Sequence, residues 1–114
     1  MTERLVHERS KDVLADRIRW ARTSFQRARG LIGRDALEPG EALVIGRAPQ
    51  VHTFFVRFPI DVIFCSDDWT VLHVISPMQR RRISRWVRRA GWVVELPAGA
   101  AAGVQPGDSL SLQR

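Results

Sequence analysis

The segment IDVIFCSDDWTVLHVI, residues 60–75, decides the fold class of this chain. Its two ends, residues 60–65 and 71–75, are rich in β-branched and aromatic residues, which favour strands over helices. Residues 66–69, Ser-Asp-Asp-Trp, separate the two ends, and Ser and Asp are typical of turns. The segment therefore predicts a β-hairpin, whose register the sequence leaves open.

Short runs of the same kind recur on both sides of this hairpin, at residues 4–7, 13–20, 42–45, 92–96 and 109–112. Strands this short need closure of the sheet, or cover by a helix, to protect their edges. We therefore expect an α+β fold that is mostly β, built around a small, partly closed, barrel-like antiparallel sheet.

Two segments predict helices. Thr23-Ser-Phe-Gln26 has the pattern of a capping box, in which Thr23 accepts a hydrogen bond from the amide three residues on. Gly33 is typical of a helix end, so we expect the main helix at about 23–33. Pro97 followed by AGAAAG predicts a short second helix at about 98–103.

The composition indicates one globular domain over residues 1–114. Hydrophobic residues at 45% and charged residues at 26% exclude a disordered chain. The longest apolar runs hold four or five residues, which excludes a membrane-spanning helix. The single Cys65 can form neither an internal disulfide nor a zinc site built on a cysteine pair. No apolar segment follows the charged start, so we expect no signal peptide and a cytoplasmic location.

One segment accounts for the net charge of +6. Residues 80–89, RRRISRWVRR, hold six arginines and no acid. Arginine binds phosphate and carboxylate through a planar fork, and a tryptophan among arginines offers a stacking face. Nucleic acid, an anionic membrane surface and an acidic protein all fit as partners, and the alternative is a solvated loop without one. The residues of this basic patch are Arg80, Arg81, Arg82, Arg85, Trp86, Arg88 and Arg89.

The loop from His52 to Pro59 is the second candidate site. Asp61 follows it inside an apolar run, and a carboxylate there needs partners, because burying a bare charge is prohibitively expensive. His52, Arg57 and backbone amides of the loop are the candidates. Either Asp61 and His52 form a polar pair in a binding pocket, or Asp61 is a structural anchor for loop 46–59. In the first reading the apolar walls of the pocket are Phe54, Phe55 and Phe58.

Three enzyme hypotheses use neighbouring residues. Cys65 with His52 or His73 would be a nucleophile and its base. His52, His73 and Asp61 would be a metal triad, although their spacing matches no compact ligand motif. Asp61 and Glu95 would be an acid–base pair. None of these patterns identifies a cofactor.

Five segments in order resemble the uncharacterised bacterial and archaeal family called domain of unknown function 192. They are Arg27-Ala-Arg-Gly-Leu-Ile-Gly-Arg34, His52-Thr-Phe54, Arg57-Phe-Pro-Ile-Asp-Val-Ile-Phe64, Glu95-Leu-Pro-Ala-Gly99 and Pro106-Gly-Asp108, and the resemblance covers about residues 13–112. It implies a compact β-rich α+β domain with one helix, and it implies no activity or cofactor. The residues that the resemblance marks as shared are Arg29, Gly30, Leu31, Pro59, Asp61, Phe64, Glu95, Gly99, Gly107 and Asp108. Trp69 departs from the pattern, because relatives usually have glycine in this turn.

We therefore expect a non-enzymatic binding or accessory module, with an unknown ligand or protein partner at the His52–Pro59 loop and Asp61. One alternative is a hydrolase-like or metal-dependent enzyme that uses His52 and Asp61. The other is a nucleic-acid or anionic-surface binder that acts through Arg80–Arg89.

Overall fold

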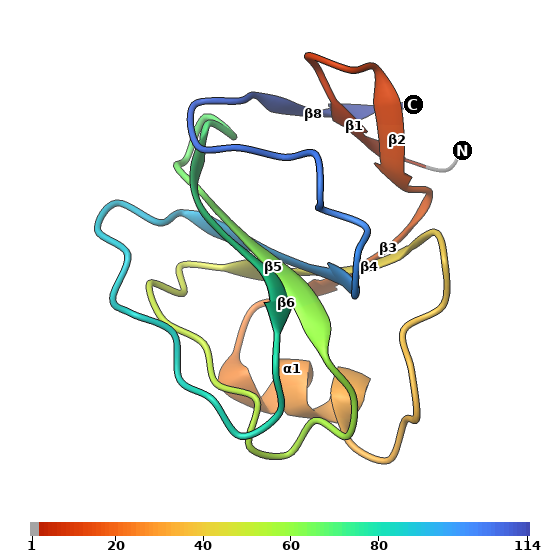
Figure 1. Ribbon diagram of the computed structural model, residues 1–114, viewed down its shortest axis with the longest axis vertical. Helices are drawn as coiled ribbons and strands as arrows, with labels where there is room; N and C mark the ends of the chain where they lie inside the picture. The colour runs from red at the N-terminus through yellow and green to blue at the C-terminus, as the bar shows by residue number, and fades with distance from the viewer. Residues whose placement is uncertain (1–2) are drawn as a thin grey trace.

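The computed structural model describes residues 3–114, with side chains throughout except at positions 24 and 25. Eight strands and one helix follow one another along the chain (Figure 1). They are β1 (Arg4–His7), β2 (Asp12–Ala15), β3 (Arg17–Ala21), α1 (Ser24–Leu31), β4 (Glu41–Gly46), β5 (Ile60–Cys65), β6 (Val71–Met78), β7 (Trp92–Pro97) and β8 (Leu110–Gln113). Within this described range, no helix has the length and hydropathy that crossing a membrane requires.

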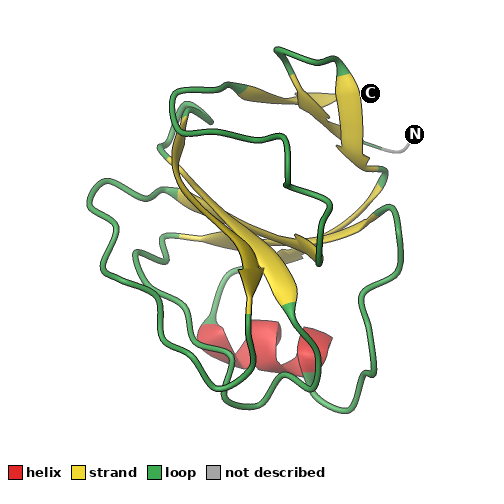
Figure 2. Ribbon diagram, viewed as in Figure 1, coloured by secondary structure: helices red, strands yellow, loops and turns green. Residues whose placement is uncertain are grey.

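The strands form two sheets. The larger has the order β3-β4-β7-β5-β6 and the smaller the order β2-β1-β8. All pairs are antiparallel except β3 and β4, which run parallel. A parallel pair needs a crossover connection, and α1 lies in that crossover. Figure 2 shows α1 on one side of the larger sheet and the smaller sheet on the other.

The inner strand β5, which lies between β7 and β6, explains why residues 60–65 decided the fold. All six of its residues are buried, because side chains from both of its faces enter a hydrophobic core. Val62 and Phe64 pack with Leu31 of the helix, whereas Ile63 and Cys65 pack with the core beneath the smaller sheet. A strand buried on both faces reads as a continuous apolar run rather than an alternating one.

The predicted hairpin is confirmed, because β5 and β6 pair antiparallel. The predicted barrel is wrong: the residues described form two separate sheets, and β3 and β6 end the larger one. The strand predicted over 13–20 is divided at Asp16 into β2 and β3, which belong to different sheets. The amides of Asp16 and Arg17 both bond the carbonyl of Gly40, at 2.9 Å, and this fixes the corner.

The main helix is confirmed, with tighter bounds than predicted. Thr23 is the N-cap, and its Oγ1 accepts from the Gln26 amide at 3.1 Å, while Gln26 Oε1 accepts from the Arg22 amide. The second predicted helix is wrong. Residues 98–103 form successive turns instead, because Gly99 has a φ of +94°, which is outside the helical region.

Candidate functional site

Asp61 is fully buried on β5 and has a structural role. Its Oδ2 accepts hydrogen bonds from Ser76 Oγ and from the Ala101 amide, each at 2.7 Å. Its Oδ1 has no partner in the described part of the chain. The prediction that this carboxylate needs partners is confirmed, but they are neither His52 nor Arg57. Asp61 anchors the turns at 98–103 rather than the loop at 46–59.

His52 lies on the surface, away from this anchor. Its ring contacts the rings of Phe54 and Phe55, with centroid distances of 5.5 and 5.0 Å. Partial burial, and then the positive charge of Arg27, lower the pKa of His52. Among residues 3–114 no hydrogen bond joins His52 to Asp61. The structure therefore does not bring these two predicted site residues together as a bonded pair.

The nucleophile and metal hypotheses also lack their geometry. Cys65 is buried on β5, and this burial, with a smaller effect of Asp68, raises its pKa to about 12. Its thiol therefore stays protonated at neutral pH. No cluster of three His, Cys, Asp or Glu side chains that could hold a metal occurs in the described chain, which is against the triad of His52, His73 and Asp61. His73 packs its ring against Phe64 instead.

Glu95 is half of a buried ion pair. The Nε of Arg27 donates to both of its carboxylate oxygens at 3.0 Å, and neither side chain is more than 6% exposed. Burial raises the pKa of Glu95, and the charge of Arg27 opposes this shift. The guanidinium also lies 5.5 Å from the ring centroid of Phe55. The pair ties α1 to β7, which leaves Glu95 no free acid–base role beside Asp61.

Most residues that the resemblance marked as shared pack in the core, form hydrogen bonds within the fold or lie in turns. Leu31 and Phe64 are in the core, and Gly30 faces the side chain of Leu43, where a Cβ would make ordinary contact at 3.6 Å. Asp108 accepts from Arg9 and from the Gln105 amide, and it contacts buried His7 at 2.7 Å. The remaining members of the set are Arg29 in the last turn of α1, Pro59 just before β5, and Gly99 and Gly107, both with positive φ.

The two loops that carry the sequence-predicted sites lie side by side. Loop 47–59 and loop 79–91 are joined by backbone hydrogen bonds from Thr53 to Arg82, Ser84 to Val51 and Val87 to Pro49, at 2.8–2.9 Å. His52 and Ile83 stand opposite each other in an isolated bridge. Three large apolar side chains remain exposed here: Phe54 at 56%, Ile83 at 59% and Trp86 at 63%.

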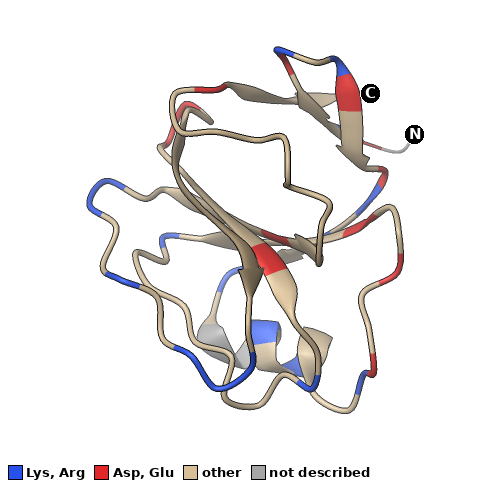
Figure 3. Cartoon of the chain, in the orientation of Figure 1, with Lys and Arg blue, Asp and Glu red and all other residues tan. Residues whose placement is uncertain are grey.

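We call the exposed side chains of these paired loops the arginine–aromatic face. Its members are Arg47, His52, Phe54, Arg80, Arg81, Arg82, Ile83, Arg85, Trp86, Arg88 and Arg89. Figure 3 shows the blue segments of loop 79–91 on one side of the molecule and the acidic segments of residues 34–41 on the other. Of the walls predicted for the pocket, Phe55 is only partly exposed and Phe58 is buried. Arg57 lies 3.8 Å from Asp35, outside the face.

The arginines of this face have no carboxylate partner among the described residues, unlike three arginines elsewhere in the fold. Arg9, Arg27 and Arg34 each form an ion pair with a carboxylate at 3.0 Å or less. Within residues 3–114 no ion pair involves Arg47 or any arginine of residues 80–89. Their charge is therefore available to an external anion.

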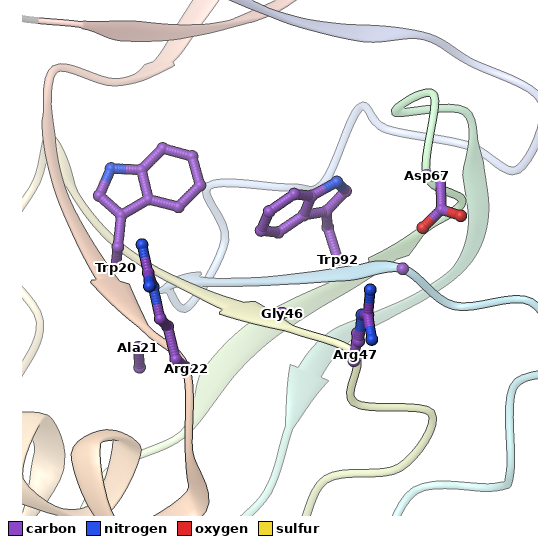
Figure 4. Close-up of a pocket in the computed structure, with 8 residues that line it drawn as sticks. Trp20, Ala21, Arg22, Gly46, Arg47, Asp67 and Trp92 are labelled. Atoms are coloured by element: carbon purple, nitrogen blue, oxygen red, sulfur yellow. The ribbon is translucent and has the colours of Figure 1, made fainter.

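A pocket that the sequence did not predict lies next to this face. It has a volume of about 700 Å³ and is formed where β3 and β4 end, β7 begins and the β5–β6 turn folds over. Figure 4 shows its lining, which consists of Trp20, Ala21, Arg22, Gly46, Arg47, Asp67, Gly91 and Trp92. We call it the tryptophan pocket. The missed signal is that an arginine follows the end of a strand twice, at Arg22 after β3 and at Arg47 after β4.

Three tryptophans hold this pocket in shape. The rings of Trp69 and Trp92 are stacked, with centroids 5.1 Å apart and an interplanar angle of 7°. Trp20 meets Trp92 at 5.7 Å and 78°, so the two rings form a corner. Trp69 has a φ of +68°, the conformation that glycine adopts most easily, so the turn keeps a glycine-like backbone with a tryptophan in it.

Comparison with known proteins identifies the family. The sequence profile of DUF192, described as an uncharacterized ACR, matches residues 5–112. This chain belongs to that family. No curated protein sequence matches the chain.

Two solved structures are similar to this DUF192 chain. A protein of unknown function from Novosphingobium aromaticivorans DSM 12444 has a TM-score of 0.79 and 24% identity, over 97% of this chain and 84% of that one. A protein from Sinorhizobium meliloti 1021, described as "a putative transcription regulator", has a TM-score of 0.76 and 25% identity, over 96% of this chain and 91% of that one. The first likeness shows the fold alone.

Proposed function

We propose that this protein acts by binding rather than by catalysis, and that its partner is a single-stranded nucleic acid held on the arginine–aromatic face. The observation that carries this proposal is that the six arginines of loop 79–91 form no ion pair among the described residues, and that the exposed rings of Trp86 and Phe54 lie on the same two paired loops. It combines two expectations from the sequence, the binding loop at His52–Pro59 and the basic run at Arg80–Arg89.

The chemistry of the face suits a single strand. Guanidinium groups bind phosphate through paired N–H donors, and this attraction does not depend on base sequence. Exposed aromatic rings stack on unpaired bases, which a duplex keeps inside its own stack. Phe54 and Trp86 are more than half exposed and lie among the arginines. An acidic protein would use the charges but would leave the rings without a planar partner.

The named relative adds support from an independent direction. The Sinorhizobium meliloti protein is described as "a putative transcription regulator", which is compatible with a nucleic-acid partner. Against catalysis stand the buried thiol of Cys65, and the structural hydrogen bonds and ion pair of Asp61 and Glu95.

The test is the affinity for a fluorescein-labelled oligothymidylate of about twelve nucleotides, measured by fluorescence anisotropy. If about five phosphates are bound, log Kd changes with log salt with a slope of about 3.5, so Kd rises about 100-fold from about 50 to 200 mM salt. The combined variant Arg81→Gln, Arg82→Gln, Arg85→Gln should make this slope shallower by about 2. Arg4→Gln is the matched control, because Arg4 is an exposed arginine on β1, in the other sheet.

The rings have their own test. Phe54→Ala and Trp86→Ala should each weaken binding by about 1–3 kcal/mol, or roughly 5- to 150-fold, at constant salt. Val13→Ala is the control, because Val13 is an exposed apolar residue on β2. Equal competition by poly-glutamate would overturn the proposal in favour of an acidic protein partner. Binding that prefers phosphatidylserine vesicles would overturn it in favour of a membrane surface.

A further inference from the structure

We infer that the tryptophan pocket binds a nucleoside monophosphate unit, either as a free nucleotide or as the terminal nucleotide of a strand. The free form stands on the pocket alone, and the terminal form rests on the proposed function. Three properties of the lining lead to this ligand: a pair of unneutralised arginines, a corner of tryptophan rings and a single acidic side chain.

The two arginines indicate a phosphate. The guanidinium groups of Arg22 and Arg47 form no ion pair and no hydrogen bond within the described residues. Figure 4 shows Arg22 beneath Trp20 on one side of the pocket and Arg47 beneath Trp92 across from it. Two guanidinium groups in one pocket provide the charge for a doubly negative group, and their planar forks suit phosphate oxygens.

The tryptophans indicate a planar ring. Trp92 stacks on Trp69, which lies in the turn between β5 and β6, and its ring lies next to the backbone of Gly46. Trp20 is 42% exposed and stands edge-on to Trp92. A base that stacks on Trp20 would lie nearly perpendicular to the Trp92 ring, because the two tryptophan rings are 78° apart. Base–aromatic stacking tolerates any base, because every base has a π face.

Asp67 indicates a hydrogen-bond donor in the ligand. Its carboxylate is on the Trp92 side of the pocket (Figure 4). An ionised carboxylate only accepts hydrogen bonds, so it suits a sugar hydroxyl or a base N–H and repels the phosphate. We therefore expect the anionic part of the ligand at the arginines and a neutral hydrogen-bond donor of the ligand at Asp67. The volume of about 700 Å³ is within the range of small-ligand pockets.

Gly46 keeps the floor of the pocket open. A Cβ at this position would meet the Trp92 ring at 3.5 Å, which is ordinary contact, and its φ is not in the left-handed region. Gly46→Ala should therefore fold normally and fill the floor. Gly91 cannot serve in this way, because a Cβ there would come within 2.0 Å of Asp67 Oδ1 and 3.0 Å of its Cα.

The first experiment is calorimetric titration with adenosine 5′-monophosphate, adenosine and ribose 5-phosphate. We expect the nucleotide to bind at least about tenfold more tightly than either fragment, with a Kd of about 1 mM or below. The combined variant Arg22→Gln, Arg47→Gln should lose at least about tenfold for the nucleotide and little for adenosine. Trp20→Ala and Gly46→Ala should each weaken nucleotide binding several-fold, whereas Arg4→Gln should leave it unchanged.

The second experiment separates the two sources of the nucleotide. Oligothymidylate with a 5′-phosphate should bind several-fold more tightly than the same strand without it if the pocket takes a strand end, and Arg22→Gln, Arg47→Gln should remove the difference. Nucleotide binding without this difference assigns the pocket to a free nucleotide.

Three results would overturn the inference. They are no detectable binding of adenosine 5′-monophosphate, binding of ribose 5-phosphate as tight as that of the nucleotide, and nucleotide binding that Arg22→Gln, Arg47→Gln leaves intact. In each case, strand binding that still depends on Arg81, Arg82 and Arg85 would leave the proposed function standing. Conversely, nucleotide binding without strand binding would refute the proposed function and support the pocket.

Discussion

Replacing Arg27 by methionine would leave the carboxylate of Glu95 buried without its partner. Glu95 is fully buried and Arg27 almost so, and the guanidinium bonds both carboxylate oxygens. Removing one member of a buried ion pair costs about 3–5 kcal/mol, because the remaining charge has no compensation. A domain of this size has a free energy of unfolding of about 5–15 kcal/mol. We therefore expect Arg27→Met to be folded but close to its limit.

The double variant Arg27→Met, Glu95→Met should be much less destabilised than the sum of its single changes. It replaces both charges by apolar side chains, and such replacements of buried pairs are often close to neutral. Urea unfolding of the wild type and the three variants then gives a coupling free energy of about 2–3 kcal/mol. Additive single and double changes would refute the reasoning, because the two charges would then not depend on each other.

The pH dependence of the Arg27→Met penalty provides a second check. Burial raises the pKa of Glu95, and in this variant no cation opposes the shift. A raised carboxyl pKa means that the folded protein holds a proton that the unfolded chain has released, so stability falls as pH rises through the folded pKa. The difference in unfolding free energy between wild type and variant should therefore be smaller at about pH 5 than at about pH 7. A difference in unfolding free energy that is the same at both pH values would contradict this account of Glu95.

Three further predictions concern buried or bonded side chains. Asp61→Ala should lower the free energy of unfolding by about 1–3 kcal/mol, because the amide of Ala101 loses its acceptor, and should leave oligothymidylate affinity unchanged. Asp108→Asn should destabilise the protein at neutral pH. Hydrogen bonds from Arg9 lower the pKa of Asp108 well below its ordinary value, so its contribution is complete above about pH 4, the ordinary aspartate value, and begins to decline only below that pH. Thermal unfolding should therefore give the same difference between wild type and variant at about pH 7 and pH 5, and a smaller but remaining difference at about pH 3. Cys65 should react with a thiol reagent only after unfolding by urea, because it is buried and its pKa is about 12; labelling of the native protein at the rate of a free thiol would contradict this.

Local signals in the sequence predicted the elements well. The capping box at Thr23 placed the start of α1, because its hydrogen bonds join residues only three or four apart. The hairpin of β5 and β6 followed from two β-prone runs and a short turn. The second predicted helix failed at Gly99, whose positive φ is outside the helical region, and the turns there bond to Asp61, which is 40 positions from Ala101 in the sequence.

The order in which the strands pair could not be predicted from the sequence. The parallel pairing of β3 with β4 requires α1 to act as a crossover, and the apolar pattern of residues 13–20 does not show that the chain changes sheets at Asp16. The tryptophan pocket depends on the same topology. Trp20 and Trp92 are 72 positions apart in the sequence, and they meet because β3, β4 and β7 are neighbours in one sheet. A sequence separation of nine positions does not say whether His52 and Asp61 meet in the fold. Within residues 3–114 Asp61 bonds Ser76 and Ala101 instead.

The two outer strands of the larger sheet carry features that discourage self-association. An outer strand presents unpaired backbone groups on which a second molecule can add a strand. On β3, Arg17 and Arg19 are exposed, and their like charges would repel an identical strand placed alongside. On β6, Pro77 lacks an amide donor, and the register shift opposite Ile60–Val62 distorts the ladder. The larger sheet is thus open but carries charge and a proline on its outer strands, so uncharged substitutions at Arg17 and Arg19 should favour the addition of a second strand along β3.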